Sequence, residues 1–421
     1  MDILHLSTSD IDNGGARAAY RLHDGLRSIG CTSKMLVRAK FSSDPTVIPE
    51  GSPLTKLGPP ISGLPLRLYP KCNSSMFSTQ WFPDVLAKRV SQFNPDIVHL
   101  HWICNGYLRI ETLPKFSQPL VWTLHDMWPF TGGCDYNRDC EKYKKSCGEC
   151  PQLESSRASD LSRWVWNRKA KFWQNANLTI VATTSWMADC ARSSSLFKNR
   201  RIEVIPLGLD TEKYKPINRQ VARELLNLPQ DKQLVLFGAI NSTSDARKGF
   251  QFLLPALQRL SVSGWKDQIE LVVFGASKPE KPIDLGFNTH YLGRVHDDIS
   301  LALIYSAADV MVVPSVQEAF GQTASEAFSC GTPVVAFDGT GLKDIVDHQQ
   351  NGYLATPFEV DDLAKGIAWI LEDGERQQKL RFEARQKSLR EFAKEVQARR
   401  YLSLYEEIKG ASVSEGFVKS S

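Results

Sequence analysis

The stretch DVMVVPSVQEAFGQTASEAFSCGTPVVAFDG, residues 309–339, decides the fold. It holds two short apolar runs, VMVV and PVVAF, separated by a polar loop and a helix-like segment. Apolar runs of this length are typical of strands buried on both faces, and a helix between two of them is typical of a parallel pair. Two carboxylates, Glu318 and Glu326, stand between the strands, where parallel sheets place their ligand-binding loops.

The same alternation runs through most of the chain. Amphipathic stretches at residues 16–30, 250–260 and 301–308 predict helices between the strands. We therefore predict an α/β protein with two Rossmann-like, doubly wound domains, at residues 1–210 and 211–392. The apolar runs that predict strands lie at residues 2–7, 34–39, 96–102, 120–126, 178–184, 233–240, 269–277, 290–295, 309–315, 333–339 and 352–356.

Two segments break this rhythm. Residues 44–83 contain eight prolines and little periodicity, which predicts a surface insertion in the first domain. Residues 393–410 predict a final helix, and residues 411–421 a flexible tail. The final helix needs a surface to cover its apolar positions, which we place at Phe392, Val396, Arg399, Leu402 and Tyr405.

Composition limits the partners and the location. The 51 Lys and Arg residues nearly balance 47 Asp and Glu residues, so a net charge of +4 gives no reason to expect nucleic acid. The apolar runs are far shorter than the roughly 20 residues that cross a bilayer. The first residues open a strand rather than a signal peptide, which predicts a cytoplasmic protein with reduced cysteines.

Candidate ligand-binding residues follow three of the predicted strands. Gly14 and Gly15 precede a helix, where backbone amides can face an anion, although a tight turn uses the same residues. His125 stands at a strand end, where a structural role is the alternative. Arg247 and Lys248 lie in a loop that opens a helix, where they could hold a diphosphate or form solvated surface.

Glu318 and Glu326 each have a structural interpretation. Thr323 and Glu326 have the spacing of a capping box, and the helix dipole favours an acid at Glu318. A functional interpretation explains both residues together, because two carboxylates could accept hydrogen bonds from the hydroxyls of a polyhydroxylated ligand. The turn between them would offer its amides to phosphate or sugar oxygens, and it consists of Ala319, Phe320 and Gly321.

Several motifs, taken together, resemble retaining family 4 glycosyltransferases, the group 1 enzymes of GT-B fold. In the second half these are RKGF, PSVQEAFGQTASEA with its E-x7-E spacing, CGTPVVAFDGTGLKDIV and NGYLAT. In the first half they are NGGA, DIVHLHW, LHD and IPLGLD. The resemblance extends from residue 2 to about residue 408. It implies two Rossmann-like domains facing a cleft, with the final helix returning to the first domain.

The resemblance also implies roles for the candidate residues. It assigns Glu318 to the donor sugar, Glu326 to the ribose of the nucleotide, and Lys248 with Arg247 to the diphosphate. His125 is expected to lie against the donor sugar, so the implied catalytic residues are Glu318, His125 and Lys248. The implied donor-binding set adds Ala319, Phe320, Gly321, Gly14 and Gly15. Two positions depart from the family pattern, since Ala239 stands where Arg is expected and Leu207 where Asn is common.

The implied activity moves a sugar from a nucleoside diphosphate sugar to a hydroxyl of a glycan or lipid-linked acceptor, in polysaccharide or glycoconjugate biosynthesis. It proceeds with retention and without a metal cofactor, the phosphate helping to deprotonate the acceptor. Three alternatives stay open: a nucleophilic Glu318, a metal held by Asp10 and Asp12 in a D-x-D sequence, and a sugar-nucleotide epimerase or non-catalytic binder of the same fold.

Two further segments carry unusual residues. Cys134, Cys140, Cys147 and Cys150 form a Cys-rich loop within residues 134–150 that could hold a structural zinc ion or remain free thiols. Residues 163–177 mix four aromatic with four basic side chains. This mixture suits either a helix on the inner membrane surface, where a lipid-linked acceptor would lie, or a core helix with a basic outer face.

Overall fold

The computed structural model describes residues 1–72, 76–238, 245–275, 284–295 and 297–418. The chain divides into two compact units, and each is described by itself. Unit 1 consists of Met1–Gly208 and Lys394–Ser421, and unit 2 consists of Leu209–Ala393. The division lies close to the boundary predicted from the sequence, after residue 210.

Unit 1 has one parallel sheet in the order β3-β2-β1-β4-β5-β6-β7. The point between β1 and β4 is the topological switch point, where the strand order reverses and where such sheets bind ligands. The strands are β1 (Asp2–Ser9), β2 (Thr32–Ala39), β3 (Val47–Pro49), β4 (Ile97–Leu100), β5 (Leu120–Leu124), β6 (Leu178–Ala182) and β7 (Ile202–Val204). The α-helices are α1 (Gly14–Ser28), α2 (Pro53–Ser62), α3 (Leu86–Phe93), α4 (Leu161–Trp173), α5 (Ser185–Ser193) and α13 (Lys394–Val418).

Unit 2 repeats this arrangement with six strands in the order β10-β9-β8-β11-β12-β13. Its switch point therefore lies between β8 and β11. The strands are β8 (Gln233–Gly238), β9 (Ile269–Phe274), β10 (Thr289–Tyr291), β11 (Val310–Val313), β12 (Val334–Phe337) and β13 (Gly352–Ala355). The α-helices are α6 (Arg219–Leu225), α7 (Phe250–Leu260), α8 (Asp298–Ala307), α9 (Gln322–Ser329), α10 (Leu342–Ile345), α11 (Val360–Leu371) and α12 (Gly374–Lys387).

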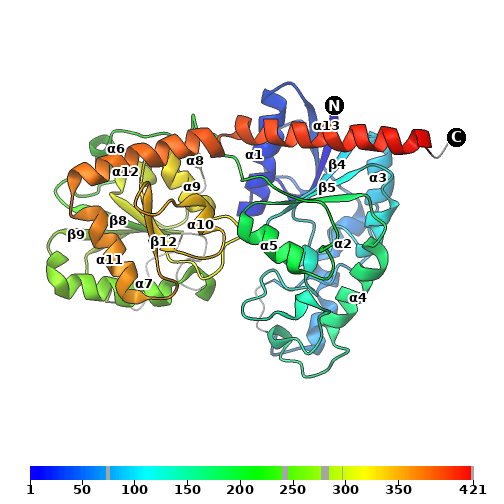
Figure 1. Cartoon of the computed structure of the whole chain (residues 1–421), viewed down its shortest axis with the longest axis horizontal. Coiled ribbons are helices and arrows are strands. Elements are labelled where there is room, and N and C mark those ends of the chain that lie inside the picture. The colour runs from blue at the N-terminus through cyan, green and yellow to red at the C-terminus, as the bar shows by residue number, and fades with distance from the viewer. Residues whose placement is uncertain (73–75, 239–244, 276–283, 296, 419–421) are drawn as a thin grey trace. The chain divides into compact units, whose positions relative to one another are not determined.

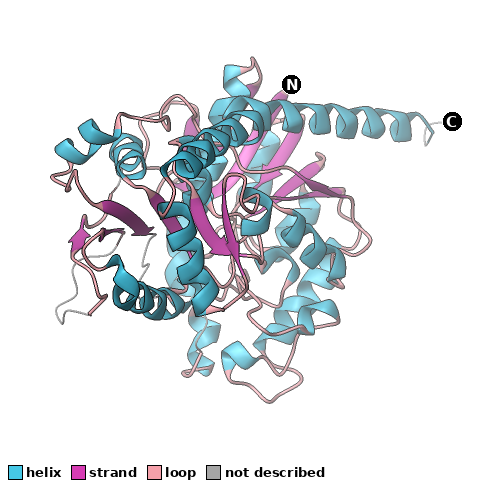
Figure 2. Ribbon diagram, turned by 60° about the vertical axis from the view of Figure 1, so that its left-hand side comes forward, coloured by secondary structure: helices cyan, strands magenta, loops and turns pink. Residues whose placement is uncertain are grey.

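The apolar runs in the sequence correspond to strands of the two sheets. Every run predicted as a strand overlaps an observed strand, and the central strands are fully buried. Figure 2 shows the strands of each unit with helices packed around them. In unit 2, α7 and α11 contribute buried residues to the same core as the strands, including Leu253, Leu257, Leu363 and Ile367. The prediction of two Rossmann-like, doubly wound domains is confirmed.

The proline-rich segment is less separate from the fold than predicted. Its first residues form β3, an edge strand paired with β2, in which Pro49 lies opposite Val37. Proline is tolerated there because an edge strand has one side without a partner. The segment continues as α2, in which Gly58 lies so close to Gly106 that a Cβ on Gly58 would be 2.3 Å from the Gly106 carbonyl oxygen. The prediction of a surface insertion was therefore wrong for residues 47–62.

The final helix, α13, belongs to unit 1 and packs against α1, which it crosses in Figure 1. The predicted buried positions were correct for Phe392 and Tyr405. They were wrong for Arg399, which is exposed, and for Val396 and Leu402, which are half-buried. The two tyrosine side chains bury their rings and satisfy their hydroxyls, with Tyr401 bonded to Thr123 Oγ1 and Tyr405 to His99 Nδ1, each at 2.6 Å. The residues that enter the core are Ala398, Tyr401, Leu404, Tyr405 and Ile408.

The helix also continues beyond the predicted end at residue 410. It reaches Val418, while residues 419–421 lie outside the described part of the chain. Continuation is reasonable because adding a residue to an existing helix gains one hydrogen bond, and no proline interrupts residues 411–418. The prediction of a flexible tail was therefore wrong for residues 411–418, which are helical.

Candidate functional site

The switch point of unit 2 brings a cationic loop and an acidic loop together. Arg247 and Lys248 follow β8, and Glu318 follows β11, the neighbouring strand across the switch point. The Lys248 ammonium forms an ion pair with Glu318 Oε1. Arg247 Nη1 lies 3.6 Å from the same carboxylate oxygen. Three charged side chains that are separated by 70 residues in sequence therefore converge at one strand edge.

The electrostatics of Glu318 follow from this contact. The side chain is largely buried, and burial alone would raise the pKa of the carboxyl group. The Lys248 and Arg247 cations outweigh that effect and hold the pKa of Glu318 below its usual range, with a further hydrogen bond from Ser315 Oγ at 3.2 Å. Glu318 is therefore ionised at neutral pH and can only accept hydrogen bonds.

A glycine allows the two loops to approach. Gly249 has a φ of +77°, and a Cβ at this position would lie 1.7 Å from the Pro314 carbonyl oxygen. The backbones are also joined directly, since the Val316 amide donates to the Arg247 carbonyl at 2.8 Å. Arg247 Nη1 donates in turn to the Gln317 carbonyl at 3.0 Å. Gly249 thus lets the cationic loop approach the acidic loop closely, and this approach brings the neighbouring Lys248 to Glu318.

The second carboxylate, Glu326, lies inside α9 and not at its cap. The helix begins at Gln322 after Gly321, which has a φ of +100°, and no side chain caps it. Thr323 is therefore inside the helix, and the capping-box interpretation of Thr323 and Glu326 was wrong. Glu326 is buried, and its Oε2 accepts a hydrogen bond from Tyr305 on α8 at 2.9 Å. Ala319 and Phe320, in the turn before α9, are buried as well.

The switch point of unit 1 brings Gly15 against His125. A Cβ on Gly15 would lie 3.6 Å from the Cβ of His125, so the helix start and the end of β5 are in contact. Asn13 caps α1 through its side chain, which accepts a hydrogen bond from the Ala16 amide at 3.0 Å. The first-domain candidates Gly14, Gly15 and His125 therefore share one region of unit 1.

His125 ends a chain of hydrogen-bonded histidines that reaches into the core. His125 Nε2 is 3.1 Å from His101 Nδ1, and His101 Nε2 is 2.9 Å from His5 Nδ1. Each neutral imidazole carries one proton, so these two bonds couple the tautomers of all three residues. His5 Nε2 is buried without a partner among the described residues, and an orphaned N–H costs more than an orphaned lone pair. The chain therefore favours a proton on His125 Nδ1.

Burial keeps these three histidine side chains neutral. It lowers the pKa of His125 to about 4, and it holds the pKa of His5 and of His101 well below the usual value. The nitrogens of His5, His99 and His101 lie within 4.8 Å of one another, as metal ligands would. His99 uses both its nitrogens, toward Tyr405 and Thr123, so the cluster is a hydrogen-bonded core rather than a metal site.

The acidic residues of the first loop have structural partners. Asp10 is fully buried, and its two oxygens accept hydrogen bonds from the amides of Phe41 and Ser42, each at 2.9 Å, and of Ile11 at 3.1 Å. Asp12 accepts from Ser9 Oγ and from Asn13 Nδ2. These contacts argue against the alternative in which the D-x-D sequence holds a catalytic metal.

Helix α4 is a core helix, as one interpretation of residues 163–177 predicted, but two of its basic residues are not on an outer face. Lys169 is completely buried, with its ammonium 3.5 Å from the centroid of the Trp128 ring. Arg168 is buried too, and it donates to both carboxylate oxygens of Glu111 at 2.6 and 2.7 Å. The helix therefore packs in the core with two of its cations inside. The prediction of a basic outer face was wrong for both residues, and their burial argues against α4 as a lipid-surface helix.

Sequence reasoning missed several residues of these sites. Tyr305, which holds Glu326, lies in a helix that the sequence showed only as apolar. Sequence reasoning also missed the cluster of His5, His99 and His101, which depends on the register that places His5 opposite His99 on β1 and β4. Leu207, where the family pattern has Asn, is buried. Ala239, the other departure, lies outside the described residues.

The chain matches two family descriptions that together span most of its length. Glycosyltransferase Family 4 matches residues 12–213, and Glycosyl transferases group 1 matches residues 219–387. The chain belongs to the family 4, group 1 glycosyltransferases. It is thus a glycosyltransferase that uses a nucleotide sugar. The match favours transfer over the epimerase and binder alternatives.

Curated relatives of this glycosyltransferase include two D-inositol 3-phosphate glycosyltransferases. The one from Xylanimonas cellulosilytica is 29% identical over 312 residues, which cover 70% of this chain and 68% of the relative. The one from Geodermatophilus obscurus is 34% identical over 308 residues, covering 69% of this chain and 63% of the relative. These identities fit the family assignment. The acceptor that the two names give is the acceptor of those relatives.

Solved structures share the fold. Sucrose-phosphate synthase from Thermosynechococcus elongatus aligns with a TM-score of 0.71 and 23% identity, covering 97% of this chain and 99% of that one. HepE of Anabaena, solved with UDP and glucose, aligns with a TM-score of 0.62 and 18% identity, covering 96% and 99%. At these identities the likeness establishes the GT-B fold class of the glycosyltransferase. No helix among its described residues is long and apolar enough to span a bilayer.

Proposed function

We propose that this glycosyltransferase moves a sugar from a nucleoside diphosphate sugar to a hydroxyl group of a glycan or lipid-linked acceptor, with retention at the anomeric carbon and without a metal ion. The contact of Lys248 and Arg247 with Glu318 carries the proposal. It puts two cations and one ionised carboxylate where a doubly wound sheet binds its ligand. A diphosphate requires the cations, and sugar hydroxyls require the carboxylate.

In the proposed reaction the diphosphate of the donor replaces Glu318 as the partner of Lys248. Glu318 is then available to accept hydrogen bonds from the donor sugar. As the glycosidic bond breaks, negative charge grows on the leaving diphosphate, and Lys248 and Arg247 stabilise it as preorganised charges. The amides of the turn at residues 319–321, before α9, add the positive end of a helix dipole. From unit 1, Gly14, Gly15 and His125 are proposed to contribute to donor binding.

The proposal assigns no carboxylate as base or nucleophile. The acceptor hydroxyl loses its proton to an oxygen of the departing diphosphate and attacks from the same face, through an oxocarbenium-like transition state. Glu318 is the rival nucleophile. His125 stays neutral at pH 7 and therefore serves as a hydrogen-bonding group rather than a cation.

We expect donor turnover to survive excess chelator. Purified protein is incubated with a panel of nucleoside diphosphate sugars, and released nucleoside diphosphate is measured with and without chelator. An acceptor panel of glycans, lipid-linked sugars and inositol phosphate, which the names of the relatives suggest, should raise that release. Activity that disappears in chelator and returns with magnesium or manganese would contradict metal independence. No release from any donor would contradict the proposed activity.

The two carboxylates should differ in what they affect. Glu326→Ala is expected to weaken nucleoside diphosphate binding by about 10- to 150-fold, because a hydrogen bond from the ribose to a carboxylate is worth about 1.5–3 kcal/mol. Glu318→Ala should chiefly lower turnover. Calorimetric titration measures the binding, and Tyr305→Phe controls for the loss of the Tyr305–Glu326 hydrogen bond. Equal affinity in Glu326→Ala and wild type would leave Glu326 a structural partner of Tyr305.

The proposed setting is polysaccharide or glycoconjugate biosynthesis in the cytoplasm, at the inner membrane face if the acceptor is lipid-linked. Since α4 buries its central cations, attachment to the membrane would need another surface. Co-sedimentation of the protein with anionic vesicles tests this part of the proposal, and recovery of all protein in the supernatant would contradict it.

A further inference from the structure

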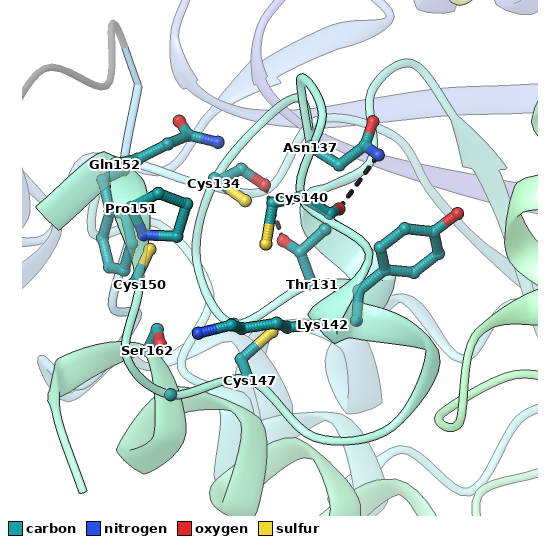
Figure 3. Close-up of a pocket in the computed structure, with 14 residues that line it drawn as sticks. Thr131, Cys134, Asn137, Cys140, Lys142, Cys147, Cys150, Pro151, Gln152 and Ser162 are labelled. Atoms are coloured by element: carbon teal, nitrogen blue, oxygen red, sulfur yellow. Dashed lines mark hydrogen bonds between the residues drawn. The ribbon is translucent and has the colours of Figure 1, made fainter. Parts of the chain in front are cut away.

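Four cysteines of unit 1 line one pocket, and none of the residues proposed to bind the donor lines it. Cys134, Cys140, Cys147 and Cys150 line a pocket with about 350 Å³ of space, part of it open to solvent. Figure 3 shows their sulfur atoms around the same hollow, with the Lys142 side chain extending across it. We propose that these four cysteines bind one zinc ion as a structural site.

The ligand chemistry fits zinc. Zinc in structural sites is held by four thiolates or by thiolates and imidazoles, and a Cys₄ set leaves no position open for catalysis. Cys147-Gly148-Glu149-Cys150 is a C-x2-C turn, and both residues between its cysteines have positive φ, +134° at Gly148 and +45° at Glu149. Both cysteines of this turn line the pocket. Cys134 and Cys140, from the preceding loop, supply the other two.

The surrounding groups are suited to thiolates. The amides of Leu153 and Gln152 are placed to donate hydrogen bonds to the Cys150 sulfur. The Gly132 amide is placed in the same way toward the Cys147 sulfur. Cysteine thiols lose their protons when they coordinate zinc. The amides would then act as hydrogen bonds to the metal-bound sulfurs.

Nearby cations offset the charge of such a site. Four thiolates and one Zn²⁺ carry a net charge of about −2. Lys142 lines the pocket, and the Arg163 guanidinium donates to the Cys147 carbonyl oxygen. Buried Lys169 interacts electrostatically with both Cys134 and Cys147.

The polypeptide around the pocket is tightly packed. A Cβ on Gly132 would lie 2.6 Å from the Cβ of Cys147, and one on Gly148 would lie 2.4 Å from the Ala158 carbonyl oxygen. The Cys150 amide donates to Asp160 Oδ2 at 2.7 Å. One adjustment is required, because no three of the four sulfur atoms lie within 4.8 Å of one another, whereas Zn–S bonds of about 2.3 Å imply sulfurs about 3.8 Å apart. Zinc would draw the two loops together.

The test measures metal and thiols in the whole protein, purified under reducing conditions without added metal. We expect about one zinc per chain by elemental analysis, and four thiols that react with a thiol reagent only after chelation under denaturing conditions. Replacement by cobalt(II) should give the absorption of tetrahedral thiolate-bound cobalt. Cys147→Ser and Cys150→Ser should lose the zinc, whereas Cys31→Ser, outside the pocket, should keep it.

Two results would overturn the proposal. The first is wild-type protein that contains no zinc, takes up none when titrated with it, and has nine reactive thiols in its native or denatured state. The second is protein whose four cysteines form disulfides under the same conditions. Both results come from the wild-type chain, so the test holds even if the serine variants fail to fold. Donor turnover is measured separately, and its value neither supports nor contradicts the zinc site.

Discussion

Lys248→Ala is expected to lower kcat on the order of a hundredfold, because removing one preorganised charge contact to the leaving group typically has that effect. The Lys248 side chain is largely buried against Glu318, so its replacement removes a cation where water cannot easily substitute for it. Steady-state kinetics with the donor found in the screen measures the change. The loss should fall on kcat more than on KM, since the charge on the diphosphate grows toward the transition state.

Two controls separate this effect from damage to the fold. Lys379→Ala removes an exposed lysine of α12 in the same unit and should leave turnover unchanged. Lys248→Arg keeps the charge beside Glu318 and should recover part of the activity. If Lys248→Ala retained turnover within a few-fold of wild type while folding normally, Lys248 would be only a structural partner of Glu318. The charge on the diphosphate would then have to be met by other groups.

Unit 1 should lose stability steeply as the pH falls below 6.5. Five of its histidines are buried with lowered pKa values, caused mainly by that burial: His5, His23, His99, His101 and His125. Between the lowered folded pKa, about 4 for His23, and the unfolded value of 6.5, each binds fewer protons in the native state than in the unfolded state. Stability therefore falls as the pH falls through this window.

The expected loss of unfolding free energy at low pH is large. Each such histidine contributes about 1.4 kcal/mol per pH unit once the pH is below 6.5. Asp126 acts in the opposite direction, because burial raises its pKa to about 7 and protonation then favours the native state. The net loss of unfolding free energy for unit 1 between pH 7.5 and pH 5.5 should be on the order of 5 kcal/mol.

Urea unfolding followed by tryptophan fluorescence measures this loss, because eight of the ten tryptophans lie in unit 1. His23→Gln removes one of the five titrations and should reduce the pH slope by about one proton. The glutamine can keep hydrogen bonds to Ser33 and Thr46, which His23 now contacts at 2.7 and 2.8 Å. The same unfolding midpoint at pH 7.5 and pH 5.5 would contradict a neutral histidine core.

The sequence predicted the sheets well because both faces of the central strands are buried. Runs such as VMVV at residues 310–313 have no alternation to misread. The strands that the sequence did not predict, β3 and β7, have three residues each and lie at sheet edges, where too few buried positions exist to form a pattern. The face of α13 was misread because Tyr401 is buried through a hydroxyl that finds a partner in the core. The spacing of apolar residues along the helix does not predict this hydrogen bond with Thr123.

The part of the candidate site that lies in sequence motifs could be predicted. The family resemblance assigned Arg247, Lys248 and Glu318 to the same site, although their direct contact could not be predicted. Tyr305 lies 21 residues from Glu326 and carries no motif of its own, so only the packing of α8 against α9 reveals it. The histidine chain depends on the register of β1 and β4, which one sequence does not give.

Because α13 packs against β1 and α1, unit 1 cannot complete its core during synthesis until residues 398–408 have been made. The segment that completes the core of unit 1, residues 398–408, is made last, about 190 residues after Gly208. At roughly 5–20 residues per second, the earlier part of unit 1 waits on the order of 10 to 40 s for its missing helix. Unit 2 is contiguous and can fold during that interval. The first strands of the chain are therefore finished last, and a nascent chain stalled before Lys394 would expose the apolar surface that Tyr401 and Tyr405 cover.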